Sequence, residues 1–183
     1  MSEPADRYRR VAGQFTARVE AVPPGGWDAP APCEGWVARD VVGHLTGWLP
    51  AFFFGTWGIS APPIPSAADD PVGAWTVLDA TIQGAVDDPA IATTVHDNHM
   101  GSTSFEDTID SICTSDVLVH TWDLAWATGL DETLDPVEVH RFVESMEPLD
   151  EVLRTSGHYG PRVPVPDGAD EQTRMLAFLG RHP

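Results

Sequence analysis

The sequence predicts an all-α fold in which four long helices form a bundle joined by long crossover loops. Two observations support this. Apolar residues recur at every third or fourth position in four separate stretches, the spacing that places them on one face of a helix. The connections between these stretches are long, and most contain several prolines, so they are crossovers rather than tight hairpins. A short C-terminal extension is expected after the bundle.

The first three helices are predicted in the amino-terminal half. Residues 4–21 carry apolar side chains at Tyr8, Val11, Phe15 and Val19, and a Pro-Pro-Gly-Gly run ends the pattern. A second helix is expected to start near residue 37 and to falter at Pro50, because proline lacks the backbone donor that an interior helical position needs. Residues 72–87 repeat the helical spacing and predict the third helix.

The fourth and clearest helix is predicted over residues 104–128, with Ser104 as its cap and Gly129 as its terminator. The segment before it, from residue 89, is β-branched and is expected to be a short strand or an ordered loop. The remaining predicted elements are a helix at 136–146, a further turn at 148–154, an extended proline-rich tail, and a last helical turn at 172–179.

Charge and composition exclude several functions. The chain contains 10 arginines, no lysine and 28 acidic residues, which gives a formal charge of −18. Such a surface repels DNA and RNA, so no nucleic-acid partner is expected. The longest apolar run contains Pro50 and two glycines and is too short for a membrane span. The amino terminus is acidic and does not resemble a secretory signal, so a cytoplasmic protein is expected. The length of the chain predicts a single domain over residues 1–183.

The two cysteines, Cys33 and Cys113, have neither the close spacing of a redox pair nor that of a metal knuckle. In a reducing cytosol they are expected to be free thiols. Sequence does not decide whether such a protein is a monomer or a homodimer.

Asp116 and His120 stand four residues apart on the predicted 104–128 helix, so their side chains project from the same face. That face is apolar, and an uncompensated carboxylate there would cost several kcal/mol of desolvation. Two explanations stay open at this point. Asp116 could belong to a structural network with His120 or Arg39, or it could bind a metal ion together with His120.

His44 favours the metal hypothesis, because it also lies among apolar residues on a different predicted helix. Two imidazoles and one carboxylate make three protein ligands, which is the arrangement of a catalytic zinc with one position left for water or substrate. Asp40, one turn earlier, could orient His44 or serve only at the helix start.

Other polar and aromatic residues allow a functional and a structural interpretation. His96 and His99 could line a pocket mouth or be solvated loop residues, and Asp123 could orient His120 or make a structural hydrogen bond. Cys113 is expected to be a buried small side chain rather than a metal ligand. Three tryptophans could wall a cavity or pack in the core: Trp48, Trp122 and Trp126. His140 and His158 have no partner in sequence.

Three segments together resemble a known family: Cys33-Glu-Gly-Trp36, Asp40-Val-Val-Gly-His44-Leu, and Asp116-Val-Leu-Val-His120-Thr-Trp-Asp-Leu-Ala followed by Gly129. They are similar to the actinobacterial metal-binding branch of the DinB superfamily, and in particular to the amino-terminal domain of mycothiol-dependent maleylpyruvate isomerase. The tail, with Tyr159-Gly-Pro-Arg and Leu176-Ala-Phe-Leu-Gly-Arg181, extends the resemblance over nearly the whole chain.

The resemblance implies a DinB-like four-helix bundle that holds a divalent metal, zinc in the first place, through His44, Asp116 and His120. It also implies mycothiol as a thiol cofactor and a small electrophile as substrate. The isomerase carries a glutamate where this chain has Asp116, whose side chain is one methylene shorter, and the resemblance does not extend to the isomerase's separate carboxy-terminal domain.

The sequence therefore predicts a metal-dependent thiol transferase or isomerase. A metal in an apolar pocket favours a thiolate over a thiol, which makes thiol transfer a natural reaction for such a site. Two alternatives remain: a non-catalytic module that binds metal and a small ligand for sensing or resistance, and a metal-free structural bundle.

Overall fold

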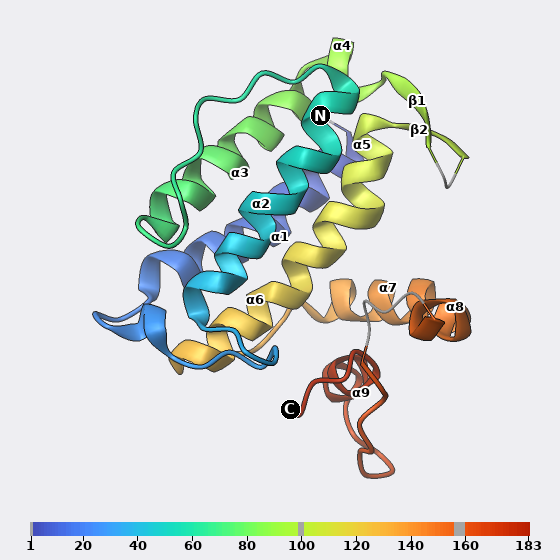
Figure 1. Cartoon of the computed structure of the whole chain (residues 1–183). Coiled ribbons are helices and arrows are strands. Elements are labelled where there is room, and N and C mark those ends of the chain that lie inside the picture. The colour runs from blue at the N-terminus through green and yellow to red at the C-terminus, as the bar shows by residue number, and fades with distance from the viewer. Residues whose placement is uncertain (1, 99–100, 156–159) are drawn as a thin grey trace.

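The computed structural model describes residues 2–98, 101–155 and 160–183 of the chain and is mostly helical, as predicted. Its only sheet within these residues is one antiparallel hairpin (Figure 1). The elements are, in chain order, α1 (Glu3–Ala21), α2 (Ala38–Trp57), α3 (Pro71–Asp87), α4 (Pro89–Ala92), β1 (Val95–Asn98), β2 (Gly101–Ser104), α5 (Phe105–Thr108), α6 (Thr114–Thr128), α7 (Pro136–Met146), α8 (Asp150–Thr155) and α9 (Glu171–Phe178).

Four long helices form the bundle. Helix α1 packs against α3 and α6, and α2 packs against the same two helices, so α1 and α2 lie diagonally across the bundle. Large side chains that are almost completely buried fill the space between them, including Phe15, Leu45, Trp75 and Leu118. The apolar positions predicted for α1 are all buried, which confirms the helical periodicity there.

Helix α2 differs from the prediction, because it continues through Pro50 to Trp57 instead of faltering there. Leu49 and Phe53 are fully buried on either side of the proline, and Trp57 is nearly so. Burial of these side chains offsets the cost of a missing backbone hydrogen bond, which is about 3 kcal/mol. The expectation of a break at Pro50 was therefore wrong, and packing is the reason.

The predicted 104–128 helix is present as α5 and α6, joined without a break by a π-helical segment at Ile109–Cys113. Ser104 caps it as expected, since its hydroxyl accepts a hydrogen bond from the backbone of Asp107. Gly129 ends it in the left-handed conformation, with φ of 68°. A π-helical segment changes the rotation of the residues that follow, and Asp116 lies only three residues after it.

The C-terminal part packs beside the bundle. Helix α7 contacts α9, and the chain end returns toward α6 (Figure 1). The segment from residue 89 begins with the short helix α4, which includes Ile91, so the strand alternative holds only for residues 95–98 and 101–104, which pair as β1 and β2. None of the described helices is long and apolar enough to cross a membrane.

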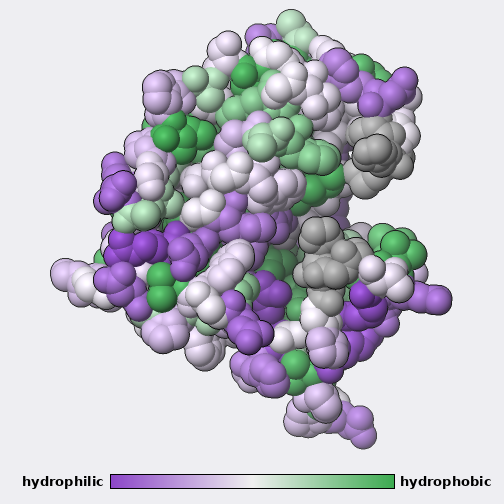
Figure 2. Space-filling view, in the orientation of Figure 1, coloured by the Kyte–Doolittle hydropathy of each residue, from purple (hydrophilic) through white to green (hydrophobic). Residues whose placement is uncertain are grey.

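The visible face is largely hydrophilic, with apolar residues in several small groups among the polar ones (Figure 2). This agrees with the acidic composition of the chain. Both cysteines are free thiols, as expected, with Cys33 partly exposed and Cys113 buried.

Candidate metal centre

Helices α2 and α6 bring His44, Asp116 and His120 together. The Nε2 atom of His44 lies 3.3 Å from Oδ2 of Asp116, and Nε2 of His120 lies 3.4 Å from Oδ1 of the same carboxylate. One ligand atom from each residue can be chosen so that all three lie within 4.8 Å of one another. The convergence that the sequence predicts is therefore present in the fold.

These separations fit a common metal ion. Zinc binds nitrogen and oxygen ligands at about 2.1 Å, so two ligands of one tetrahedral ion lie about 3.4 Å apart. Ordinary N–H···O hydrogen bonds are shorter, at about 2.7–3.2 Å. Two imidazoles and one carboxylate also form a donor set that zinc accepts readily. Each imidazole nitrogen thus lies at a ligand–ligand spacing from one oxygen of Asp116, and the three side chains form a donor set that suits a divalent cation.

The site is closed on one side and open on the other. The side chain of His120 is only 6% exposed, whereas those of His44 and Asp116 are 32% and 25% exposed. Solvent therefore reaches His44 and Asp116, whereas His120 is enclosed. The buried side carries the groups that hold His120.

The two groups of α6 influence each other's pKa strongly. Burial disfavours the charged imidazolium of His120, but Asp116 and then Asp123 outweigh this effect and raise its pKa to about 9. Burial would raise the pKa of Asp116, but His120 and His44 lower it far below its ordinary value. Without a metal, these groups form a partly buried ion pair.

Asp123 holds the other nitrogen of His120. Its Oδ2 lies 2.8 Å from Nδ1 of His120, and its side chain is completely buried. The pKa of Asp123 is lowered because His120 and Arg181 overcome the opposing effect of burial. An ionised carboxylate only accepts hydrogen bonds, so Nδ1 is the donor and Nε2 is the nitrogen that faces Asp116. Asp123 therefore contacts His120, as both the orienting and the structural interpretation of Asp123 require.

Two tryptophans support the same cluster. The indole Nε1 of Trp48 donates a hydrogen bond of 3.0 Å to Oδ2 of Asp116. Trp36 stacks on His120 with ring centres 6.0 Å apart and lies against His44 at 5.3 Å. Trp48 is thus a partner of the carboxylate rather than only a wall or a core residue.

Two predicted contacts are absent from this cluster. Arg39, which was considered as a partner for Asp116, instead pairs with Asp28 at 2.6 Å and with the carbonyl of Ala68. Asp40 accepts a hydrogen bond from the backbone of Val37, so it serves at the start of α2 and does not orient His44. Both side chains are thereby used locally, near the amino-terminal end of α2.

The remaining candidate histidines and the second cysteine have other surroundings. His96 lies in β1 with its ring against Trp57, at 5.4 Å between ring centres. His140 pairs with glutamates of the C-terminal part, and Cys113 is buried in the core, as expected. His99 and His158 lie outside the described residues.

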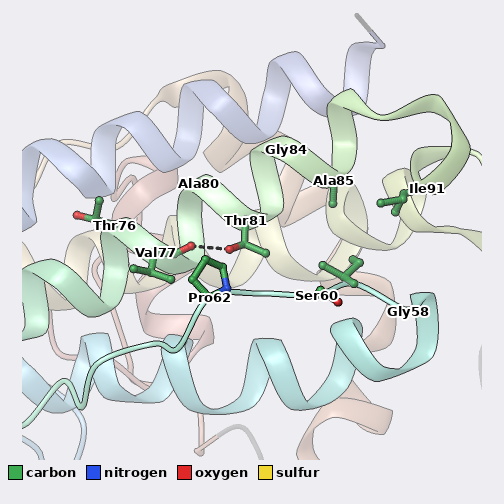
Figure 3. Close-up of a pocket in the computed structure, with 11 residues that line it drawn as sticks. Gly58, Ser60, Pro62, Thr76, Val77, Ala80, Thr81, Gly84, Ala85 and Ile91 are labelled. Atoms are coloured by element: carbon green, nitrogen blue, oxygen red, sulfur yellow. Dashed lines mark hydrogen bonds between the residues drawn. The ribbon is translucent and has the colours of Figure 1, made fainter.

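Trp122 is buried in the core, whereas Trp126 is 42% exposed and pairs with the ring of Trp122. A groove with a volume of about 570 Å³ lies between α3 and the segment after α2 (Figure 3). Small and apolar residues line it, among them Pro62, Ala80 and Gly84, and none of the three candidate ligands does.

Sequence reasoning gave no role to Cys33 and Arg181, although both lie in the segments that carry the family resemblance. Arg181 donates to both oxygens of Asp123, and its Nη2 lies 3.4 Å from Sγ of Cys33. The signal that could have found them was their membership of those segments, since no periodicity links positions 33, 123 and 181.

Comparison with known proteins agrees with this picture. Residues 8–53, which include His44, match the family model described as the mycothiol maleylpyruvate isomerase N-terminal domain. Over 181 residues, which cover 98% of this chain and 98% of each relative, the chain is 27% identical to two proteins of Mycobacterium tuberculosis: uncharacterized protein MT0763 of strain CDC 1551 / Oshkosh and uncharacterized protein Rv0738 of strain H37Rv. No solved structure matches the chain significantly. The resemblance to the mycothiol maleylpyruvate isomerase N-terminal domain, which the sequence motifs predict, is thus confirmed over residues 8–53.

Proposed function

We propose that the chain binds a divalent cation, zinc in the first place, through His44, Asp116 and His120, and that it transfers a low-molecular-weight thiol to a small electrophile. The observation that carries this proposal is the spacing of 3.3 Å and 3.4 Å between the carboxylate oxygens and the two imidazole nitrogens. The match of residues 8–53 to a mycothiol-related family supports mycothiol as the thiol.

Each residue has a distinct task in this proposal. Asp123 keeps the proton on Nδ1 of His120, so that Nε2 is free to bind the cation. Trp48 holds one oxygen of Asp116 through its indole N–H. A cation held there would favour the thiolate form of the cofactor at neutral pH. The exposed side at His44 and Asp116 admits the thiol and the electrophile.

The reaction requires no oxidant or reductant. In the addition of a thiol to an activated double bond, the sulfur forms a bond to one carbon and the thiol proton ends on the neighbouring carbon. The reverse step restores the double bond and the free thiol, so addition, rotation and elimination together amount to an isomerisation. The absence of a redox step is consistent with a site made only of imidazole and carboxylate groups.

Metal analysis of protein purified without added metal tests the first half of the proposal. We expect one equivalent of zinc or a similar divalent ion per chain, lost in His44→Ala and in His120→Ala. The matched control is His140→Ala, because His140 is an exposed histidine whose ion pairs in the described part of the chain are with Glu144 and Glu171. Equal metal content in all four proteins would contradict the site.

Turnover tests the second half. We expect the metal-loaded protein to convert maleylpyruvate, or another small electrophile with an activated double bond, only when mycothiol is present. Tight binding of mycothiol without turnover would instead identify a non-catalytic module. A chain that binds no metal, and whose stability does not change on chelation, would be the metal-free bundle in which these residues form an internal network.

A further inference from the structure

Arg181 connects the end of the chain to the buried side of the candidate metal centre. Its Nε donates to Oδ1 of Asp123 at 3.1 Å and its Nη2 donates to Oδ2 at 2.8 Å, so the contact is bidentate. The guanidinium also contacts Cys33, whose Sγ lies 3.4 Å from Nη2. Asp123 and Arg181 are 58 residues apart in sequence.

The backbone holds Arg181 in place from the other side. Its N–H donates to the carbonyl of Leu176 in α9 at 2.9 Å, and its Nη1 donates to the carbonyl of Leu179 at 3.3 Å. Both leucines are buried. The guanidinium is therefore fixed relative to α9, and through Asp123 it is fixed relative to α6.

Asp123 needs this partner. Its side chain has no exposed surface, and a buried carboxylate with too few donors either takes up a proton or turns toward other donors. His120 supplies one N–H, to Oδ2, and Arg181 supplies donors to both oxygens. A planar guanidinium matches the carboxylate plane, so it sets the orientation of Asp123 as well as its charge.

We propose that Arg181 is a positioning residue of the candidate metal centre, which acts through Asp123 to fix the ring of His120 with Nε2 toward Asp116 and His44. The part of this inference that concerns the cation rests on the proposed function. The part that concerns the His120 ring holds for the protein without metal and can be tested separately.

The first test is the affinity for Zn²⁺, measured by competition with a chromogenic chelator. We expect Arg181→Gln to bind Zn²⁺ about 10–100-fold more weakly, the usual effect of losing a group that orients a metal-binding histidine. Arg181→Lys keeps the charge but not the bidentate contact, so its Zn²⁺ affinity should lie between that of Arg181→Gln and that of the natural protein. The control is Arg174→Gln on α9, because Arg174 is half-exposed and the polar contacts of its side chain with the described residues are with Ala169 and Glu171, away from Asp123. It should bind within twofold of the natural protein.

The second test is the side-chain NMR signal of the His120 Nδ1–H in metal-free protein. A proton held between a buried ring and a fixed carboxylate exchanges slowly with water, so we expect a visible signal in the natural protein and in Arg174→Gln. In Arg181→Gln the signal should broaden or disappear. A purely structural role for Arg181 would lower the unfolding temperature without changing either readout of the folded protein.

The outcomes separate the two proposals. If the natural protein binds no Zn²⁺, the proposed function fails, and the NMR signal alone decides the role of Arg181. An Arg181→Gln protein that folds and keeps both its Zn²⁺ affinity within twofold and its Nδ1–H signal would overturn the inference. If Arg181→Gln does not fold, Arg181→Lys decides, because unchanged affinity and signal in that variant overturn it equally.

Discussion

Replacement of Asp123 by asparagine should destabilise the metal-free protein in a way that depends on pH. Asparagine has nearly the same shape as aspartate but places an amide donor where one carboxylate oxygen was. Three N–H donors, one from His120 and two from Arg181, converge on that carboxylate. The variant therefore loses a charge and sets one donor against another in a completely buried position.

Two contributions give the magnitude. The pKa of His120 is raised from 6.5 to about 9, which corresponds to about 3 kcal/mol of folding free energy. Asp116 contributes more to this shift than Asp123, so less than half of it, on the order of 1 kcal/mol, belongs to Asp123. The pair with Arg181 adds about 2 kcal/mol, below the full value for a buried ion pair because Arg181 keeps 16% of its side chain exposed. The expected total is about 3 kcal/mol at pH 6.

The pH dependence follows from the direction of the shift. Because folding raises the pKa of His120, the charged His120 stabilises the folded protein fully below pH 6.5, and this stabilisation is lost as the pH rises through about 9. Arg181 stays charged over this range, so its pair with Asp123 persists. The difference between the natural protein and Asp123→Asn should thus fall from about 3 kcal/mol at pH 6 to about 2 kcal/mol at pH 10.

Urea unfolding at 25 °C in the presence of a chelator measures this difference at each pH. Asp69→Asn is the control, because Asp69 is exposed and its removal should change stability by less than about 0.5 kcal/mol. A difference below about 1 kcal/mol at pH 6, or one that does not decrease toward pH 10, would refute the reasoning about Asp123.

Three further predictions concern the fold and the metal. Pro50→Ala should stabilise the protein by roughly 1–3 kcal/mol, since alanine can donate to the carbonyl of Thr46 within α2; urea unfolding measures this, and a loss of stability would contradict it. Arg7→Met should cost about 3 kcal/mol in the same assay, because the buried Glu138 would keep Arg10 as its one cationic partner among the described residues and Asp110 would lose its contact with Arg7. An unchanged midpoint would show that these pairs add nothing. Chelation should lower the unfolding temperature of the metal-loaded protein by on the order of 10 °C, if the free metal concentration before chelation is about 1,000 times the Kd. Calorimetry measures this shift, and the His44→Ala variant should not show it.

Much of the fold could be predicted because apolar periodicity is a local property of the chain. The spacing of Tyr8, Val11, Phe15 and Val19 predicts the buried face of α1 without knowledge of its neighbours. The passage of α2 through Pro50 could not be predicted in this way, since it depends on how strongly Leu49 and its neighbours pack against other helices. The π-helical segment before Asp116 has no recognised sequence signal either.

In the candidate site, too, local contacts could be predicted from sequence and long-range contacts could not. Asp116 and His120 could be paired from sequence because four residues make one turn of a helix, and His44 was joined to them by its apolar surroundings and by the family resemblance. The contacts of Asp123 with Arg181 and of Trp48 with Asp116 join residues 58 and 68 positions apart. No periodicity links such positions, so only the packed structure reveals them.

The geometry of the site depends on two different kinds of constraint. The backbone of α6 alone sets the separation of Asp116 and His120, and therefore most core substitutions should leave it intact. The position of His44 depends on the packing of α2 against α6, including the fully buried Leu45 next to it. A shift of about 1 Å between these helices would move His44 out of bonding range of a shared cation, because zinc–nitrogen bonds vary by only about 0.2 Å. Affinity for metal and stability of the α2–α6 contact should consequently change together, whereas variants of the α1–α3 contact should alter stability with little effect on affinity.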